Sequence, residues 1–77
     1  YQAVILDPPR AGAKEQCQSL ARSDVSDILY VSCAPTTFAR DAKILQNAGY
    51  RLRSLQLIDQ FTWSRHSELI GIFHRDP

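Results

Sequence analysis

Four short apolar runs along the chain have the length and composition of β-strands. Residues 3–6 and 28–32 are apolar almost throughout, which is typical of parallel strands covered on both faces. Residues 52–58 alternate between apolar and polar side chains, and residues 68–74 form the fourth run. Only a short loop separates the last two runs, so these strands are predicted to pair antiparallel.

Two stretches between the predicted strands have helical spacing. Residues 13–22 place small or apolar side chains, Cys17 among them, on one face. The second predicted helix has Pro35 in its first turn and stops at Gly49. This alternation predicts an α/β protein with a mostly parallel sheet, one antiparallel strand near its edge, and helices on the sheet faces.

Size and composition limit the chain to one small domain. It has 77 residues, 44% of them hydrophobic, which is enough for a modest core. Its formal net charge of +1 gives no overall basic signal for nucleic acid. Cys17 and Cys33 match neither a disulfide framework nor a zinc motif, so a reducing, cytoplasmic compartment and no metal are expected. No apolar run approaches the roughly 18 residues of a membrane span.

The beginning of the chain predicts that it is part of a longer protein. The sequence contains no methionine and starts at Tyr1. Its first apolar run, Val4-Ile5-Leu6, suits the middle of a sheet and would expose an unpaired edge if no strand lay beside it. We therefore expect the isolated chain to self-associate through this strand or to be unstable.

Three chemistry-bearing residues fall where the predicted sheet brings them to one edge. Asp7 follows the first strand in the rigid run Asp7-Pro8-Pro9-Arg10, and Cys33 follows the second strand, just before a helix. Ligands of open α/β sheets bind outside the carboxyl ends of the strands. Because the last strand is predicted to be antiparallel, Glu68 at its start lies at the same edge. A thiol, a candidate base and an orienting carboxylate together are the components of an active site.

Each of these residues has a simpler interpretation when taken alone. Asp-Pro sequences are common in loops, and most cysteines of small domains are buried and inert, as we expect for Cys17. A carboxylate at the start of a strand is normally a solvated end residue. Only the convergence on one edge favours the catalytic interpretation of Asp7, Cys33 and Glu68.

Together these motifs resemble the RNA 5-methyluridine methyltransferases. The resemblance is carried by Asp7-Pro8-Pro9-Arg10, by residues 32–41 (Ser-Cys-Ala-Pro-Thr-Thr-Phe-Ala-Arg-Asp), by Asp59-Gln60-Phe61 and by His66-Ser67-Glu68. It covers nearly the entire chain, in the order of the family's final segment. It implies that residues 1–77 are the C-terminal portion of a class I methyltransferase catalytic domain and form half of its Rossmann-like sheet. The subgroup that modifies rRNA is nearer than the tRNA subgroup.

The resemblance also implies a reaction. The family transfers a methyl group from S-adenosylmethionine to C5 of a uridine in RNA, through a covalent adduct that divides one hard step into easier ones. Cys33 matches the nucleophile that adds to C6, Glu68 matches the base that removes the C5 proton, and Asp7 matches an acid that contacts the methyl donor. Weaker candidates for contacts with the RNA substrate are Arg10, Trp63 and His66.

The sequence departs from the family at Ala34, where Asn is usual, which puts the orientation of Cys33 in question. The chain also has no Gly-x-Gly turn to hold the methyl donor. The isolated chain is therefore predicted to be inactive without the N-terminal part of the same protein. Two alternatives stay open. One is a non-catalytic, degenerate methyltransferase-like binding module. The other is an adenine amino-methyltransferase, a class that has no thiol and an aromatic residue where Arg10 stands.

Overall fold

The computed structural model of the chain describes residues 3–59 and 67–76. Its helices and strands agree with the predicted elements to within two residues at each end. In chain order they are β1 (Ala3–Leu6), α1 (Lys14–Ala21), β2 (Asp27–Ser32), α2 (Pro35–Asn47), β3 (Arg51–Asp59) and β4 (Ser67–His74). The predicted start and stop residues of the second helix are confirmed. Pro35 begins α2, and Gly49 follows its end with a positive φ of 101°.

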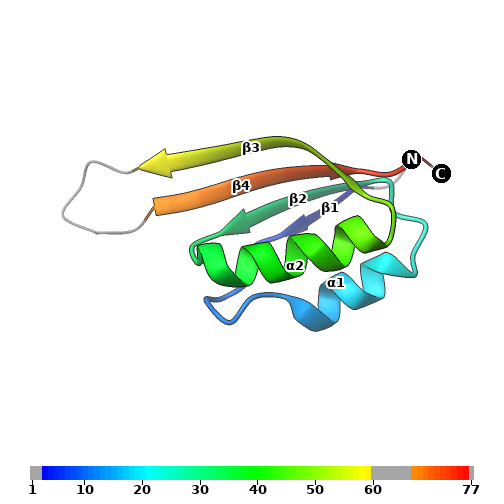
Figure 1. Ribbon diagram of the computed structural model, residues 1–77, viewed down its shortest axis with the longest axis horizontal. Coiled ribbons are helices and arrows are strands. Elements are labelled where there is room, and N and C mark those ends of the chain that lie inside the picture. The colour runs from blue at the N-terminus through cyan, green and yellow to red at the C-terminus, as the bar shows by residue number, and fades with distance from the viewer. Residues whose placement is uncertain (1–2, 60–66, 77) are drawn as a thin grey trace.

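The strands form one mixed sheet in the order β1-β2-β4-β3 (Figure 1). β1 pairs parallel with β2, and β4 pairs antiparallel with both β2 and β3. Three strands therefore run one way and β4 runs the other, so the predicted antiparallel strand is confirmed. β4 lies second from the edge. The connection through α2 places β3 two positions away from β2 in the sheet, and β4 then lies between β2 and β3.

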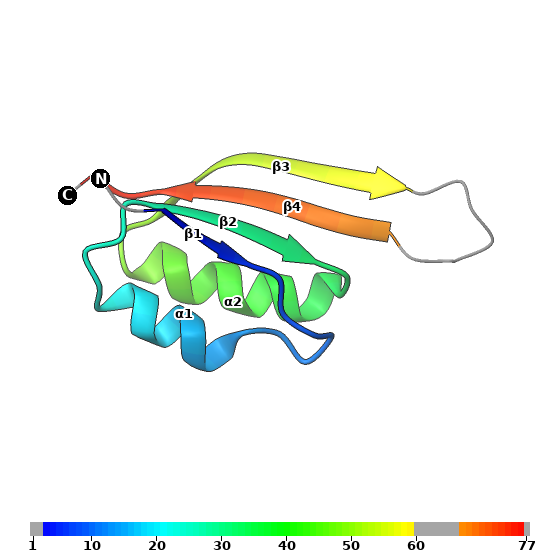
Figure 2. The ribbon, with the colours of Figure 1, turned by 180° about the vertical axis from the view of Figure 1, so that it is seen from behind.

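Both helices cover the same face of the sheet (Figure 1 and Figure 2). We expected helices on the faces of the sheet, but within the described residues the opposite face is bare. The two βα connections step across the sheet in the same direction, and crossovers of constant hand then place both helices on one side. The bare face carries apolar side chains, including Ile5, which is 71% exposed, and Ile72, which is 40% exposed.

The core lies between the sheet and the two helices. Strand alternation turns Ile28, Tyr30 and Ser32 toward the helices. Phe38 of α2 packs against the rings of Tyr30 and Phe73, with centroids 5.2 Å and 6.1 Å away. The other buried members of this core are Ala13, Cys17, Leu20, Val25, Ala42, Leu45 and Tyr50.

The Phe38 ring lies in the space where a side chain at Gly71 would otherwise be. A Cβ at position 71 would lie 2.8 Å from Phe38 Cζ and 2.9 Å from Cε1. Gly71→Ala is therefore expected to lower the free energy of unfolding by about 1–3 kcal/mol, because a packed core has no room for another methyl group. Urea denaturation measures the loss. The same substitution should cost less in a Phe38→Leu background, and an equal cost in both backgrounds would rule out crowding.

Arg75 bonds to the C-terminal ends of both helices, which lie at the same end of the molecule. Its Nη1 donates hydrogen bonds to the carbonyl oxygens of Ala21 and Ala48, 3.1 Å and 2.9 Å away. Carbonyl groups at helix C-termini lack partners within the helix, so one cation satisfies both ends. The guanidinium also lies over the Tyr50 ring, 4.2 Å from its centroid. This end is occupied by structural contacts, and the residues with candidate chemistry gather at the other.

Candidate active site

Cys33 and Glu68 lie at the rim where β2 ends and β4 begins. Ser32, the last residue of β2, pairs with Leu69. Because these strands are antiparallel, the next positions beyond that pair are Cys33 on one strand and Glu68 on the other. Both residues are partly exposed, so neither is sealed in the core. The register of the sheet thus leads, one residue beyond its last pair, to a thiol on one chain segment and a carboxylate on the other, both partly exposed.

Asp7 reaches the same rim from β1. That strand runs parallel to β2 with Leu6 paired to Tyr30, so both strands end at this side of the sheet. Asp7 is exposed and lines a surface hollow with Pro9, Gly12 and neighbouring residues. A carboxylate accepts hydrogen bonds only, and this one is open to N–H or O–H groups of a ligand at the edge where α/β sheets bind them.

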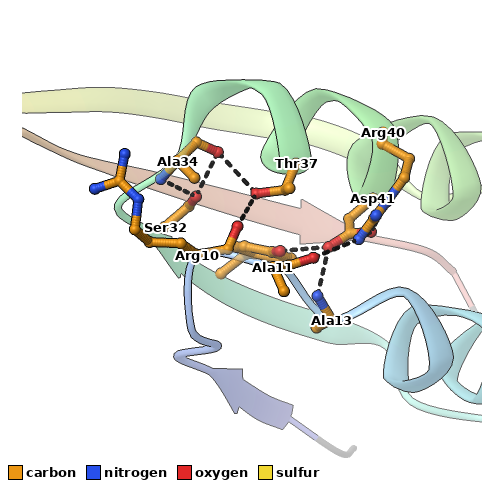
Figure 3. Close-up of polar contacts among 9 residues, drawn as sticks. Arg10, Ala11, Ala13, Ser32, Ala34, Thr37, Arg40 and Asp41 are labelled. Atoms are coloured by element: carbon orange, nitrogen blue, oxygen red, sulfur yellow. Dashed lines mark hydrogen bonds and ion pairs between the residues drawn. The ribbon is translucent and has the colours of Figure 1, made fainter.

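Hydroxyl groups hold the turn that contains Cys33. Ser32 Oγ accepts a hydrogen bond from the Ala34 N–H at 3.1 Å and donates to the Ala34 carbonyl oxygen at 3.0 Å (Figure 3). Thr37 Oγ1 lies 3.1 Å from that same carbonyl oxygen. Ala34 is the N-cap of α2 and makes no side-chain cap. The turn is therefore held from both sides by Ser32 and Thr37, although Ala34 itself offers no side-chain hydrogen bond.

A buried carboxylate joins the loop after β1 to α2. Asp41 has no exposed surface. Its Oδ2 accepts hydrogen bonds from the Ala13 N–H at 2.7 Å and from the Tyr30 hydroxyl at 2.5 Å. Its Oδ1 pairs with Arg40, whose Nε and Nη2 each lie 3.0 Å away. Arg40 Nη2 also donates to the Ala11 carbonyl oxygen at 3.0 Å.

Sequence reasoning did not identify Asp41 as a site residue. Its only signal was its place at the end of the run from Ser32 to Asp41 that carries the family resemblance. Two of its partners, Tyr30 and Ala13, are 11 and 28 positions away in the sequence, a separation that no local pattern shows.

Burial keeps two neighbours of Asp41 protonated. Burial raises the pKa of Tyr30 well above its usual value, and the hydrogen bond to Asp41 raises it further. Burial also raises the pKa of the Cys17 thiol to about 12, with a smaller contribution from the Asp41 charge. Cys17 is therefore a buried thiol at neutral pH, in agreement with its interpretation as an inert core residue. The protonated Tyr30 hydroxyl is thus the donor in its hydrogen bond to Asp41.

The remaining predicted residues are Arg10, Trp63 and His66. Arg10 is exposed, and its guanidinium points away from the hydrogen-bonded cluster (Figure 3), while its carbonyl oxygen accepts a hydrogen bond from Thr37 at 3.0 Å. Trp63 and His66 lie outside the described residues. Within residues 3–59 and 67–76, no three His, Cys, Asp or Glu side chains cluster as a metal site would require. No helix in this part of the chain is long and apolar enough to cross a membrane.

The architecture and the rim define the class of the protein. It is an α/β protein with a mixed sheet whose chemistry-bearing side chains lie at the carboxyl ends of the parallel strands, where such folds bind ligands. The chain belongs to the tRNA (uracil-5-)-methyltransferase family, whose family model matches residues 1–76.

Relatives of known sequence and structure agree with this family. The chain is 53% identical over 72 residues to an uncharacterized RNA methyltransferase of Caulobacter vibrioides, covering 94% of this chain and 17% of the relative. It is 45% identical over 73 residues to the 23S rRNA (uracil(1939)-C(5))-methyltransferase RlmD of Pseudomonas putida, covering 95% of this chain and 16% of that protein.

The fold is similar to that of a solved methyltransferase. The tRNA (uracil-54, C5)-methyltransferase of Pyrococcus abyssi, determined in complex with S-adenosyl-L-homocysteine, superposes with a TM-score of 0.78 at 40% identity. The match covers 95% of this chain and 18% of that structure. The 77 residues thus span less than a fifth of the relatives they match.

Proposed function

We propose that the longer protein containing this chain methylates C5 of a uridine in RNA, with S-adenosylmethionine as the methyl donor. The observation that carries the proposal is that Cys33 and Glu68 each lie one residue beyond the last β2–β4 pair, Ser32 with Leu69. Membership of the family supports it. So does the solved relative, because S-adenosyl-L-homocysteine is what remains of this donor after methyl transfer.

Cys33 is proposed to make uracil reactive. Carbon C5 of uracil is a weak nucleophile. When the Cys33 thiolate adds to C6, the sulfur–carbon bond forms and the electron pair of the C5=C6 bond is released toward C5 and its neighbouring carbonyl. The methyl donor supplies an electrophilic methyl group, which the enriched C5 accepts. The partly exposed position of Cys33 at the rim leaves the thiol open to a base brought in from solvent. A base in folded RNA would have to be turned out of its stack to reach it.

Glu68 is proposed to complete the reaction. Its carboxylate removes the proton from the methylated C5, the electron pair restores the C5=C6 bond, and the Cys33 thiolate leaves. A base for this step must sit close to the carbon next to the one bonded to sulfur. Glu68 comes one residue before Leu69, the partner of Ser32, and Cys33 comes one residue after Ser32, which supports this role.

Asp7 is proposed to bind the methyl donor. Its exposed carboxylate lines the hollow at the end of β1 and suits the hydroxyl and amino groups of a nucleoside. The sequence has no Gly-x-Gly turn to accompany it. We therefore assign most of the donor pocket to chain outside these 77 residues.

Residues 1–77 are proposed to form the C-terminal half of a Rossmann-like catalytic sheet. In the described part of the chain, no strand pairs with the outer edge of β1, and a groove lined by Val4, Leu6, Gln16 and Leu20 lies beside it. The bare face carries Ile5. Apolar edges and faces of this kind need a cover. The rest of the longer protein would supply it, in a reducing, cytoplasmic compartment that suits a free catalytic thiol.

The isolated chain is expected to transfer no methyl group and to self-associate through β1. Labelled S-adenosylmethionine with uridine RNA measures the first property, and light scattering over a range of concentrations measures the second. An Ile5→Lys variant, with a charge on the open edge strand, should be less associated. Turnover by the isolated chain, or a clean monomer at high concentration, would contradict the corresponding half of this prediction.

RNA containing 5-fluorouridine tests the proposed reaction. Mixed with the full-length protein and the methyl donor, it should become covalently attached, because fluorine cannot leave C5 as a cation and the adduct cannot resolve. Mass spectrometry of the digested complex should locate the RNA on Cys33. A non-catalytic binding module or an adenine amino-methyltransferase forms no such adduct, so its absence would reject the proposal.

A further inference from the structure

Three side chains on one face of α2 grip the loop that follows β1. Thr37, Arg40 and Asp41 are spaced three and four residues apart, so they share a helix face. Each bonds to the backbone of the loop rather than to its side chains (Figure 3). The bonds join Thr37 to the Arg10 carbonyl oxygen, Arg40 to the Ala11 carbonyl oxygen, and Asp41 to the Ala13 N–H. We call these three side chains the α2 clasp.

Thr37 connects the two segments that carry the candidate chemistry. Its Oγ1 lies 3.0 Å from the Arg10 carbonyl oxygen and 3.1 Å from the Ala34 carbonyl oxygen. Both are acceptors, so the single hydroxyl hydrogen is shared between the loop after Asp7 and the turn after Cys33. One side chain thus spans from the one segment to the other.

Gly12 shows how closely the loop lies on the clasp. It has a φ of +88°, which favours glycine, and its N–H donates to the Pro9 carbonyl oxygen at 2.8 Å. A Cβ at this position would lie 2.6 Å from Arg40 Nη2 and 2.8 Å from Asp41 Oδ2. A side chain at position 12 would therefore displace the loop or the clasp.

Asp41 anchors the clasp to the sheet at an energetic cost. A fully buried carboxylate must recover its lost hydration through hydrogen bonds, and Asp41 does so with Tyr30 of β2, with Ala13 and with Arg40. Apolar packing would join a loop to a helix more cheaply. A charge that bonds to the sheet, the helix and the loop instead defines one position for the loop.

We propose that Thr37, Arg40 and Asp41 are positioning residues that set the placement of the Asp7 loop, and with it the methyl donor, relative to Cys33. This inference rests on the proposed function. Methyl transfer requires donor and uracil to meet in one geometry, and a displacement of about 1 Å can cost about 10²-fold in rate. The clasp acts on the loop through its backbone.

The test compares Thr37→Val with Thr37→Ser in the full-length protein. Val keeps the shape of Thr and removes the hydroxyl, whereas Ser keeps the hydroxyl. Thr37→Val is expected to lower kcat for methyl transfer by about 10- to 100-fold and to raise KM for the methyl donor, with KM for RNA unchanged. Thr37→Ser should restore both values toward those of the unsubstituted protein.

Tyr50→Phe is the control for the loss of a hydroxyl that bonds to backbone carbonyl oxygens. The Tyr50 hydroxyl donates to the Val25 carbonyl oxygen at 2.5 Å, at the end of the helices away from Cys33. This variant is expected to lose stability and to keep kcat. The positioning role is overturned if Thr37→Val also keeps kcat. It is equally overturned if Thr37→Val loses activity only in proportion to the fraction of unfolded protein, which is the loss that Tyr50→Phe would show.

Amide hydrogen exchange of residues 10–13 separates this inference from the proposed reaction. Exchange there should accelerate in Thr37→Val and not in Tyr50→Phe. Unchanged exchange would overturn the clasp whatever the activity. If the unsubstituted protein forms no adduct with 5-fluorouridine RNA, the reaction is wrong, and exchange still decides whether the clasp holds the loop.

Discussion

Cys33→Ala in the full-length protein is expected to abolish covalent capture of 5-fluorouridine RNA and to lower methyl transfer by at least about 10³-fold. Without the thiol no bond to C6 forms, and C5 stays too poor a nucleophile to accept a methyl group. Losses of this size are usual when the nucleophile of a covalent mechanism is removed. Methyl transfer from a labelled donor and a denaturing gel for the protein–RNA adduct measure the two effects.

The same substitution at the other cysteine is the control. Cys17 has no exposed surface and lies in the core, where burial holds its thiol protonated. Cys17→Ala should therefore cost some stability and leave the adduct intact in the folded protein. Turnover by Cys33→Ala, or an adduct that maps to Cys17, would show that Cys33 is not the nucleophile.

Glu68→Gln is expected to slow turnover by about 10²- to 10⁴-fold, the usual contribution of a general base. Addition of Cys33 and methylation should still occur, but the C5 proton is then removed slowly and the thiolate cannot leave. A covalent protein–RNA complex should therefore accumulate with ordinary uridine RNA and the methyl donor, without fluorine to trap it.

Glu15→Gln supplies the matched control for Glu68. Glu15 is exposed in the first turn of α1, on neither β2 nor β4, and the change removes the same charge. This variant should turn over normally and accumulate no complex. An inactive Glu68→Gln variant that forms no complex would place its defect before the adduct and contradict the role of base.

The elements of this fold were predictable because the information for them is local. Periodicity identifies a strand or helix from neighbours in the sequence, and Pro35 and Gly49 mark the start and end of α2 through their own backbone preferences. The rim was predictable for a similar reason. Once two strands are known to be parallel and a third antiparallel, their ends fall on known sides of the sheet, which brings Asp7, Cys33 and Glu68 to one edge.

The sequence by itself determined the strands, the helices, and the candidate acid, thiol and base. Only the tertiary structure decided that β4 lies between β2 and β3 and that both helices cover one face of the sheet. It also decided that the Phe38 ring packs where a side chain at Gly71 would lie, and that Asp41 bonds to a loop distant in the sequence. These features depend on contacts between groups far apart along the chain. The free energies of these contacts come from side-chain packing and from the pairing of a buried charge. Neither contribution exists before the chain has folded.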